Sequence, residues 1–226
     1  MKRILALVLA ATMVLAFAGC GAEKKGEGVL TYAEYDAAAL DTQVTVETYV
    51  QAKQSWWDNK ATVYTQDKDG GYFLYNMTCS EADYEKLTPG AKIKVTGYKS
   101  EWSGEVEIVD ATFEVENGNY VAKPEDVTSL LGKDELIKKQ NKLVSFKDMT
   151  VVNVSYKNDE PGDDIYVTLS KEGNNYDFCL EYYLNGSDEA FYNTVGGLTA
   201  GTVVDVEGFL YWYEGANPHI TKVTVK

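Results

Sequence analysis

The sequence predicts an all-β protein with minor helices: two five-stranded Greek-key barrels in tandem, each with a short helix between its third and fourth strands. A phrase of 18 residues is nearly repeated, as "LTPGAKIKVTGYKSEWSG" from Leu87 and as "LTAGTVVDVEGFLYWYEG" from Leu198. Apolar and polar residues alternate with the period of two that is typical of half-buried strands. The same order of three strands, one helix and two strands stands on both sides of a polar linker.

The first half opens with a short helical stretch, "YAEYDAAAL". Three strands follow, and a helix then begins with "SEAD", which is typical of a polar N-cap followed by an acidic first turn. The fourth strand is the repeated phrase, and in the fifth we expect Val106, Ile108, Ala111 and Phe113 to point inward. The expected ranges are 44–50, 60–66 and 72–77 for the first three strands, 80–87 for the helix and 105–114 for the fifth strand.

The second half is expected to follow the same plan. Its lead-in, "GKDELIKKQ", matches the helical stretch that precedes the first half. The expected ranges are 143–156, 164–170 and 175–183 for its first three strands, 187–195 for its helix and 219–225 for its last strand.

The repeated phrase predicts a bend as well as a strand. In the first copy Ile93 and Val95 alternate with polar residues, and in the second copy Val204 and Val206 do so. Gly97 interrupts the first copy and a glycine falls 111 residues later in the second, at Gly208. Because glycine inside a strand usually marks a bulge or a tight bend, we expect both strands to bend at the same place.

The N-terminus reads as an export signal. Lys2 and Arg3 precede an uncharged run, 4–18, that is shorter than the roughly 20 residues of a membrane-spanning helix. The run ends in "FAGC", which resembles the lipobox of bacterial lipoproteins and implies lipidation of Cys20. We therefore expect an extracytoplasmic protein held at the cell membrane. The expected organisation is a signal peptide (1–19), a lipidated tether (20–29), a first barrel (30–117), a linker with a short helix (118–139) and a second barrel (140–226).

Both halves resemble OB-fold domains, because five strands with a helix between the third and fourth is the OB-fold arrangement. The whole chain resembles tandem OB-fold lipoproteins of Gram-positive bacteria, and the segment from "VTVETYVQAKQSWWDNK" to "GGYFLYNM" resembles bacterial OB domains described as nucleic-acid-binding-like. The resemblance implies a ligand across strands two and three, between the loops that join strands one to two and four to five. The aromatic residues expected there are Trp56, Trp57, Tyr64, Tyr72, Tyr75 and Trp102 in the first barrel and Tyr211, Trp212 and Tyr213 in the second.

Such aromatic residues stack sugar rings and bases, and they also fill cores and close barrels, so both roles stay open. The chain has a formal net charge of −14, and both halves are acidic. Because a nucleic-acid site draws its affinity from cations, this charge disfavours nucleic acid as a partner. We therefore expect a binding module for a carbohydrate or another ring-bearing molecule, with single-stranded nucleic acid or a protein partner as the alternatives.

Nothing in the sequence singles out an enzyme, a metal site or a cofactor. The one histidine, His219, is expected at the surface or at a strand edge. Cys79 and Cys179 are placed one in each half, which leaves a disulfide between them open. The acidic loop around Asp163 has oxygen ligands of the kind that Ca²⁺ prefers, but its spacing matches no calcium loop, so we favour a solvated turn.

Overall fold

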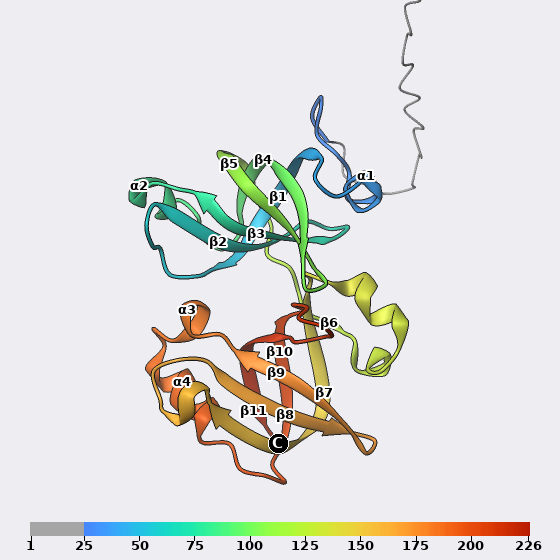
Figure 1. Ribbon diagram of the computed structural model, residues 1–226, viewed down its shortest axis with the longest axis vertical. Helices are drawn as coiled ribbons and strands as arrows, with labels where there is room; N and C mark the ends of the chain where they lie inside the picture. Colours follow the sequence, from blue (N-terminus) through green and yellow to red (C-terminus); the bar gives the residue numbers. More distant parts are fainter. Residues whose placement is uncertain (1–24) are drawn as a thin grey trace, which may run out of the picture.

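The computed structural model describes residues 25–226, drawn in colour in Figure 1. The predicted signal peptide, Cys20 and half of the predicted tether lie outside the described residues. The chain forms two β units that are stacked along the long axis of the molecule (Figure 1). No helix within residues 25–226 is both long enough and apolar enough to cross a membrane.

The first unit is a closed five-stranded barrel with the strand order β1-β2-β3-β5-β4. Its neighbouring strands are antiparallel, except that β3 and β5 run parallel. A short helix, α2, lies between β3 and β4 and is capped by the Ser80 side chain, which accepts a hydrogen bond from the Asp83 N–H. This is an OB-like barrel. Its elements are α1 (Tyr32–Ala37), β1 (Gln43–Lys53), β2 (Lys60–Gln66), β3 (Gly71–Thr78), α2 (Glu81–Tyr84), β4 (Ala91–Trp102) and β5 (Glu105–Asn119).

The second unit is a six-stranded sheet with the order β10-β11-β9-β8-β7-β6, in which β10 also pairs with β7. The strands β9 and β11 run parallel, as β3 and β5 do in the first unit. Helices α3 and α4 lie between β9 and β10. The elements are β6 (Glu125–Asp126), η1 (Thr128–Leu130), η2 (Asp134–Lys139), β7 (Leu143–Tyr156), η3 (Lys157–Asp159), β8 (Ile165–Lys171), β9 (Asn174–Leu180), α3 (Tyr182–Asn185), α4 (Glu189–Gly196), β10 (Val203–Phe209) and β11 (His219–Val225).

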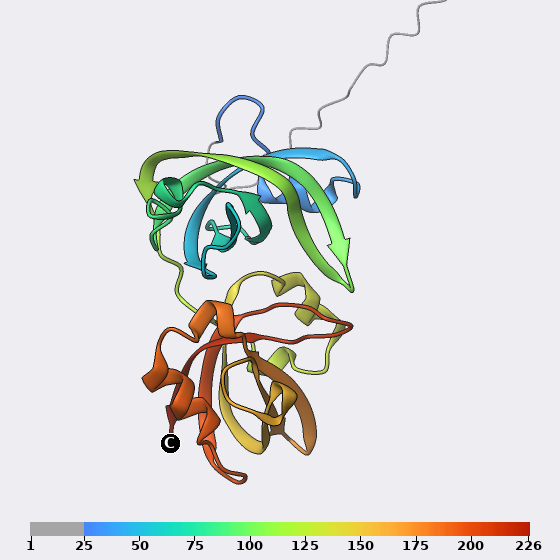
Figure 2. The same ribbon diagram turned by 60° about the vertical axis from the view of Figure 1, so that its left-hand side comes forward.

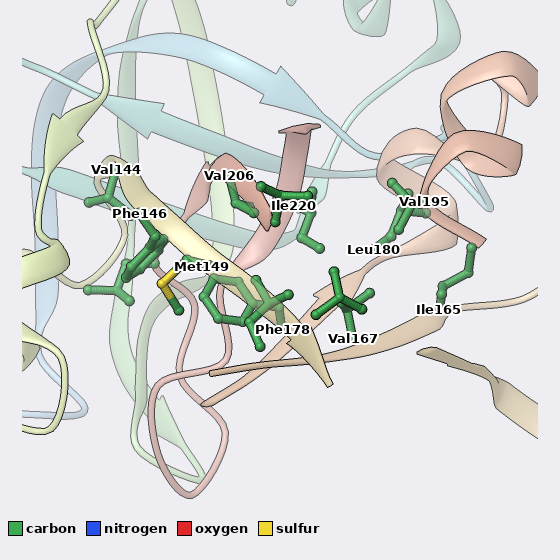
Figure 3. Packing of buried hydrophobic residues seen from close by; sticks show 14 of the residues in the cluster. Val144, Phe146, Met149, Ile165, Val167, Phe178, Leu180, Val195, Val206 and Ile220 are labelled. Carbon is green, nitrogen blue, oxygen red and sulfur yellow. The ribbon is translucent and has the colours of Figure 1, made fainter. Parts of the chain in front are cut away.

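Each unit has its own apolar core, formed by alternate residues of its strands. In the repeated phrase the inward residues Ile93, Val95, Val204 and Val206 are all buried, as their alternation predicts. Figure 3 shows the second core, where side chains from β7, β8, β9 and β11 meet around Phe178. Burial of these side chains is the main favourable contribution to folding.

Irregular strand pairing accompanies both glycines at which the sequence predicts a bend. The pairing of β4 with β5 shifts register between Thr96 and Tyr98, and the pairing of β10 with β11 shifts between Glu207 and Gly208. A Cβ atom at Gly97 would lie 2.7 Å from Ile108 Cγ2, and one at Gly208 would overlap the His219 carbonyl oxygen. Both positions therefore need glycine for close packing against the neighbouring strand.

Several predicted bounds are wrong. The strand β5 continues to Asn119, where it pairs with Ala91, instead of ending at Glu114. Tyr182 and Tyr183 lie in α3 instead of extending β9, because the Glu181 carboxylate caps a helix at that point. The linker carries two 3₁₀ helices and a short strand, β6, that runs parallel to β7.

Candidate interdomain binding cleft

A cleft of about 780 Å³ lies between the two units. One wall comes from β2, β3 and the loop after β1, which contribute Trp57, Lys60 and Tyr75. The facing wall comes from β8, the end of β9 and the loop between β10 and β11, which contribute Tyr166 and Tyr211. In an OB-like unit these strands and loops form the ligand-binding face, so the corresponding faces of the two units are turned toward one cleft.

The equivalent loops of the two units touch each other at one end of the cleft. The β4–β5 hairpin of the first unit extends to the second unit (Figure 2), and its Trp102 ring lies 5.2 Å from the Tyr213 ring, between centroids. The Glu214 N–H donates a 2.8 Å hydrogen bond to the Ser103 carbonyl oxygen. Gly104 has a positive φ of 92°, and a Cβ there would lie only 2.6 Å from Trp212 Cδ1. The last residues of both repeated phrases thus form a single contact.

A buried aromatic cluster joins the two units below the cleft. The Tyr64 ring of β2 stacks on the Phe209 ring of β10, with centroids 4.5 Å apart. The Tyr64 hydroxyl is 2.6 Å from His219 Nδ1, and the imidazole stacks on Tyr211 with centroids 4.2 Å apart. Phe73 completes the cluster from β3. The position of one wall relative to the other is therefore fixed by packed side chains.

The prediction that His219 lies at the surface or at a strand edge is wrong. The imidazole is buried between the units, and this burial lowers its pKa to about 3. Burial disfavours the charged form of histidine, so His219 is neutral at ordinary pH. The sequence predicted an exposed position because His219 is the first residue of a strand and directly follows Pro218. In the structure, the start of this strand, β11, lies against the first unit.

Three carboxylates line the cleft. Glu181 accepts hydrogen bonds from the Leu184 N–H at 2.6 Å and the Tyr183 N–H at 3.2 Å. Burial and the nearby charge of Asp164 raise the pKa of Glu181 to about 7, although these two hydrogen bonds act to lower it. Asp164 pairs with Lys157 at 3.1 Å. The third carboxylate is Glu107, and burial raises its pKa as well.

Five of the nine predicted aromatic site residues line the cleft: Trp57, Tyr75, Trp102, Tyr211 and Tyr213. The other four do not line it. Trp56 donates from its indole N–H to the Cys79 carbonyl oxygen, and Tyr64 is sealed in the joint between the units. Tyr72 points into the first barrel, where its hydroxyl donates to Asp67 at 3.2 Å, and Trp212 packs on Gly104. Alternation along β3 explains the difference between Tyr72, which points inward, and Tyr75, which points outward.

The cleft residues that sequence reasoning missed include two carboxylates and two exposed tyrosines: Glu107, Glu181, Tyr166 and Tyr183. Tyr166 alternates with Ile165 and Val167, which are both buried, so the period of two places it on the outer face of β8. This signal was available in the sequence. Glu107 and Glu181 carried no signal of their own, because a buried carboxylate has the same sequence signature as an exposed one.

Neither cysteine forms a disulfide within the described residues, since Cys79 and Cys179 are both free and buried. Burial raises the pKa of Cys79 to about 11 and raises that of Cys179 further. In the acidic β7–β8 loop, Lys157 pairs with Asp163 at 3.2 Å. Across residues 25–226 no group of three or more His, Cys, Asp or Glu side chains is arranged to hold a metal ion.

No family model matches the sequence, and no curated protein matches it. Solved structures similar to it include a murine DNA binding protein bound with double-stranded DNA, with a TM-score of 0.39 and 10% identity over 80% of this chain and 96% of that chain. A p204 HINb domain is similar with a TM-score of 0.37 and 10% identity over 84% of this chain and 100% of that chain. A replication protein A heterotrimer bound to single-stranded DNA is similar with a TM-score of 0.34 and 13% identity, over 84% of this chain and 51% of that chain.

Proposed function

We propose that this protein is a non-enzymatic binding protein, made of two OB-like units in tandem, that stacks a ring-bearing ligand in the cleft between them. A carbohydrate is the ligand class that we favour. One observation carries the proposal: six of the seven exposed aromatic side chains in the described part of the chain line this cleft. The six are Trp57, Tyr75, Trp102, Tyr166, Tyr183 and Tyr213, and the seventh is Tyr98.

The physical reason is the cost of leaving these rings in water. The Trp57 side chain is 73% exposed and the Trp102 side chain 54% exposed, although each ring would gain free energy by covering its faces. Contiguous apolar patches on a monomer are usually interaction sites. A ring that lies between two aromatic faces gains about 1–3 kcal/mol for each one that it covers.

Two of the groups that line the cleft are poorly suited to catalysis. The His219 imidazole is hydrogen-bonded to Tyr64 and stacked on Tyr211, and its low pKa makes it a poor general base. The Cys179 thiol, whose pKa is raised by burial, is a poor nucleophile.

The cellular location in this proposal rests on the N-terminal residues of the sequence. Lys2 and Arg3, the uncharged run and the "FAGC" segment favour export, lipidation at Cys20 and an extracytoplasmic protein anchored in the cell membrane. The segment around residues 25–30 would then link the membrane anchor to the first barrel.

Single-stranded nucleic acid is the second candidate. The same exposed rings on OB-like faces favour it, because aromatic side chains stack bases of any sequence. The charge opposes it, because three carboxylates line the cleft against two lysines, Lys60 and Lys157.

Quenching of tryptophan fluorescence across a panel of oligosaccharides tests the proposal. We expect saturable quenching in the wild type, a loss of about tenfold or more in affinity in Trp57→Ala or Trp102→Ala, and no loss in Tyr98→Ala. Tyr98 is the matched control because its ring is exposed outside the cleft. A flat response to every glycan rejects carbohydrate binding. Binding of a labelled single-stranded oligonucleotide that weakens steeply between about 50 and 200 mM salt would favour the second candidate.

A further inference from the structure

Glu107 is a carboxylate of the cleft that lacks a partner. It stands opposite Phe73 in the parallel pairing of β5 with β3, and its neighbour Ile108 points into the first barrel. Alternation therefore turns Glu107 outward, to the cleft that it lines. The residue is only 7% exposed, and no hydrogen bond or ion pair from residues 25–226 reaches its carboxylate oxygens.

Other shielded carboxylates of this protein do have partners. Glu105 accepts a 2.8 Å hydrogen bond from the Trp212 N–H at one oxygen, while its Oε1 is buried without a partner. Glu181 caps α3, and Glu47 pairs with Lys92 at 2.7 Å. Removing a carboxylate from water without a partner costs free energy, so such groups are normally paired or hydrogen-bonded. Glu107 has no such partner, and its carboxylate oxygens stay accessible from the cleft, where a ligand would reach them.

The surroundings of Glu107 are aromatic. Phe73 and Tyr211 form an edge-to-face pair with centroids 5.4 Å apart, and Tyr75 stacks on Phe73 at 6.3 Å. Burial, with the charges of Glu105 and Glu107, raises the pKa of Tyr211. A carboxylate beside aromatic faces is the combination that binds an organic cation, by ion pairing and by cation–π attraction.

The lysines of the cleft leave the Glu107 charge available. Lys157 is held by Asp163 and Asp164, at 3.2 and 3.1 Å. Lys60 is exposed at the start of β2, next to Trp57 in the β1–β2 loop. Neither lysine pairs with Glu107 in the described part of the chain.

We propose that the ligand of the cleft carries a positively charged nitrogen, which Glu107 binds while the exposed aromatic side chains cover the ring that bears it. Amino sugars are the class that combines such a ring with such a charge. This inference rests on the proposed function, since it specifies the ligand of the same cleft.

The test compares two ligands that differ in charge but share a skeleton: a trimer of glucosamine and a trimer of N-acetylglucosamine. Binding is followed by tryptophan fluorescence near neutral pH, because burial raises the pKa of Glu107 and acidic buffer would remove the charge under test, whereas the free amines are still partly protonated. We expect the wild type to bind the glucosamine trimer at least about tenfold more tightly, the effect of one charge-assisted hydrogen bond. We expect Glu107→Gln, which keeps the side-chain size and removes the charge, to abolish this preference while keeping its affinity for the acetylated trimer.

Glu114→Gln is the matched control. Glu114 lies on the same strand, is exposed outside the cleft, and its substitution changes the net charge equally. It should leave the preference unchanged. Equal affinity of the wild type for both trimers overturns the inference without using any variant, and so does a preference that survives in Glu107→Gln. If neither trimer quenches the wild type, carbohydrate binding itself fails, and this outcome differs from equal binding of both.

Discussion

Replacing His219 tests the structure of the joint between the two units. Burial lowers the pKa of His219 to about 3, whereas the same side chain in the unfolded chain titrates near 6.5. Between these pH values the unfolded chain binds a proton that the folded chain does not bind. Stability therefore falls as the pH falls through this window. At about 1.4 kcal/mol per pH unit, the loss due to His219 between pH 7 and pH 5 is about 2 kcal/mol.

The assay is urea unfolding of the wild type and of His219→Asn at pH 7 and pH 5. Asparagine keeps a polar group near the Tyr64 hydroxyl but does not titrate. The pKa values of Glu105 and Glu181, raised to about 9 and about 7, act in the opposite direction, because folding holds protons that the unfolded chain releases. They contribute equally to both proteins, so the difference between the two isolates His219, the one histidine of the chain.

The variant should be less stable at pH 7, because it loses the stacking on Tyr211, but it should lose about 2 kcal/mol less than the wild type on going to pH 5. Parallel losses in the two proteins would refute a buried, neutral imidazole at this position.

Two further outcomes follow from the packing. Gly208→Ala should lower the free energy of unfolding by about 1–3 kcal/mol, because the added Cβ overlaps the His219 carbonyl oxygen, and an unchanged urea midpoint would contradict the bend. Cys79 and Cys179 should react with a thiol reagent only after unfolding, because both are buried and have raised pKa values. Peptide mapping distinguishes them from Cys20, and immediate labelling of either one in the native protein would contradict its burial.

The parts of the fold that were predictable depend on local patterns. Alternation placed Ile93 and Val204 in the two cores, and a glycine at the same offset in each repeat marked the two places where strand pairing is irregular. Both signals act over a few residues, so the rest of the chain does not change them. The prediction failed where a longer-range contact competes with a local signal. The Asn117–Gly118 pair is typical of a turn, yet β5 continues through it because β4 provides a partner as far as Ala91.

The C-terminal end of β9 shows that strand propensity is limited in the same way as a predictor. Tyr182 and Tyr183 favour strands, which is why the sequence predicted a strand through them. In the structure the carboxylate of Glu181 accepts two backbone N–H groups and starts α3 instead. The helix cap provided by one side chain outweighs the β preference of the two residues that follow it. Propensities summed residue by residue do not take such a cap into account.

The candidate site was predictable only in part, because the cleft belongs to two units and not to either one alone. Tyr64 and Tyr75 both point outward from the first barrel and are equivalent in sequence terms. Tyr64 is 1% exposed and Tyr75 is 45% exposed, and the difference arises because Phe209 of the second unit covers one and not the other. Docking of the two units thus buries some of the outward-pointing aromatic rings, which hold the two walls together. The other rings stay exposed in the cleft, where a ligand can contact them. It follows that ligand affinity and docking are coupled: a substitution in the Tyr64 and Phe209 contact should weaken binding at Trp57 and Trp102 without touching the ligand.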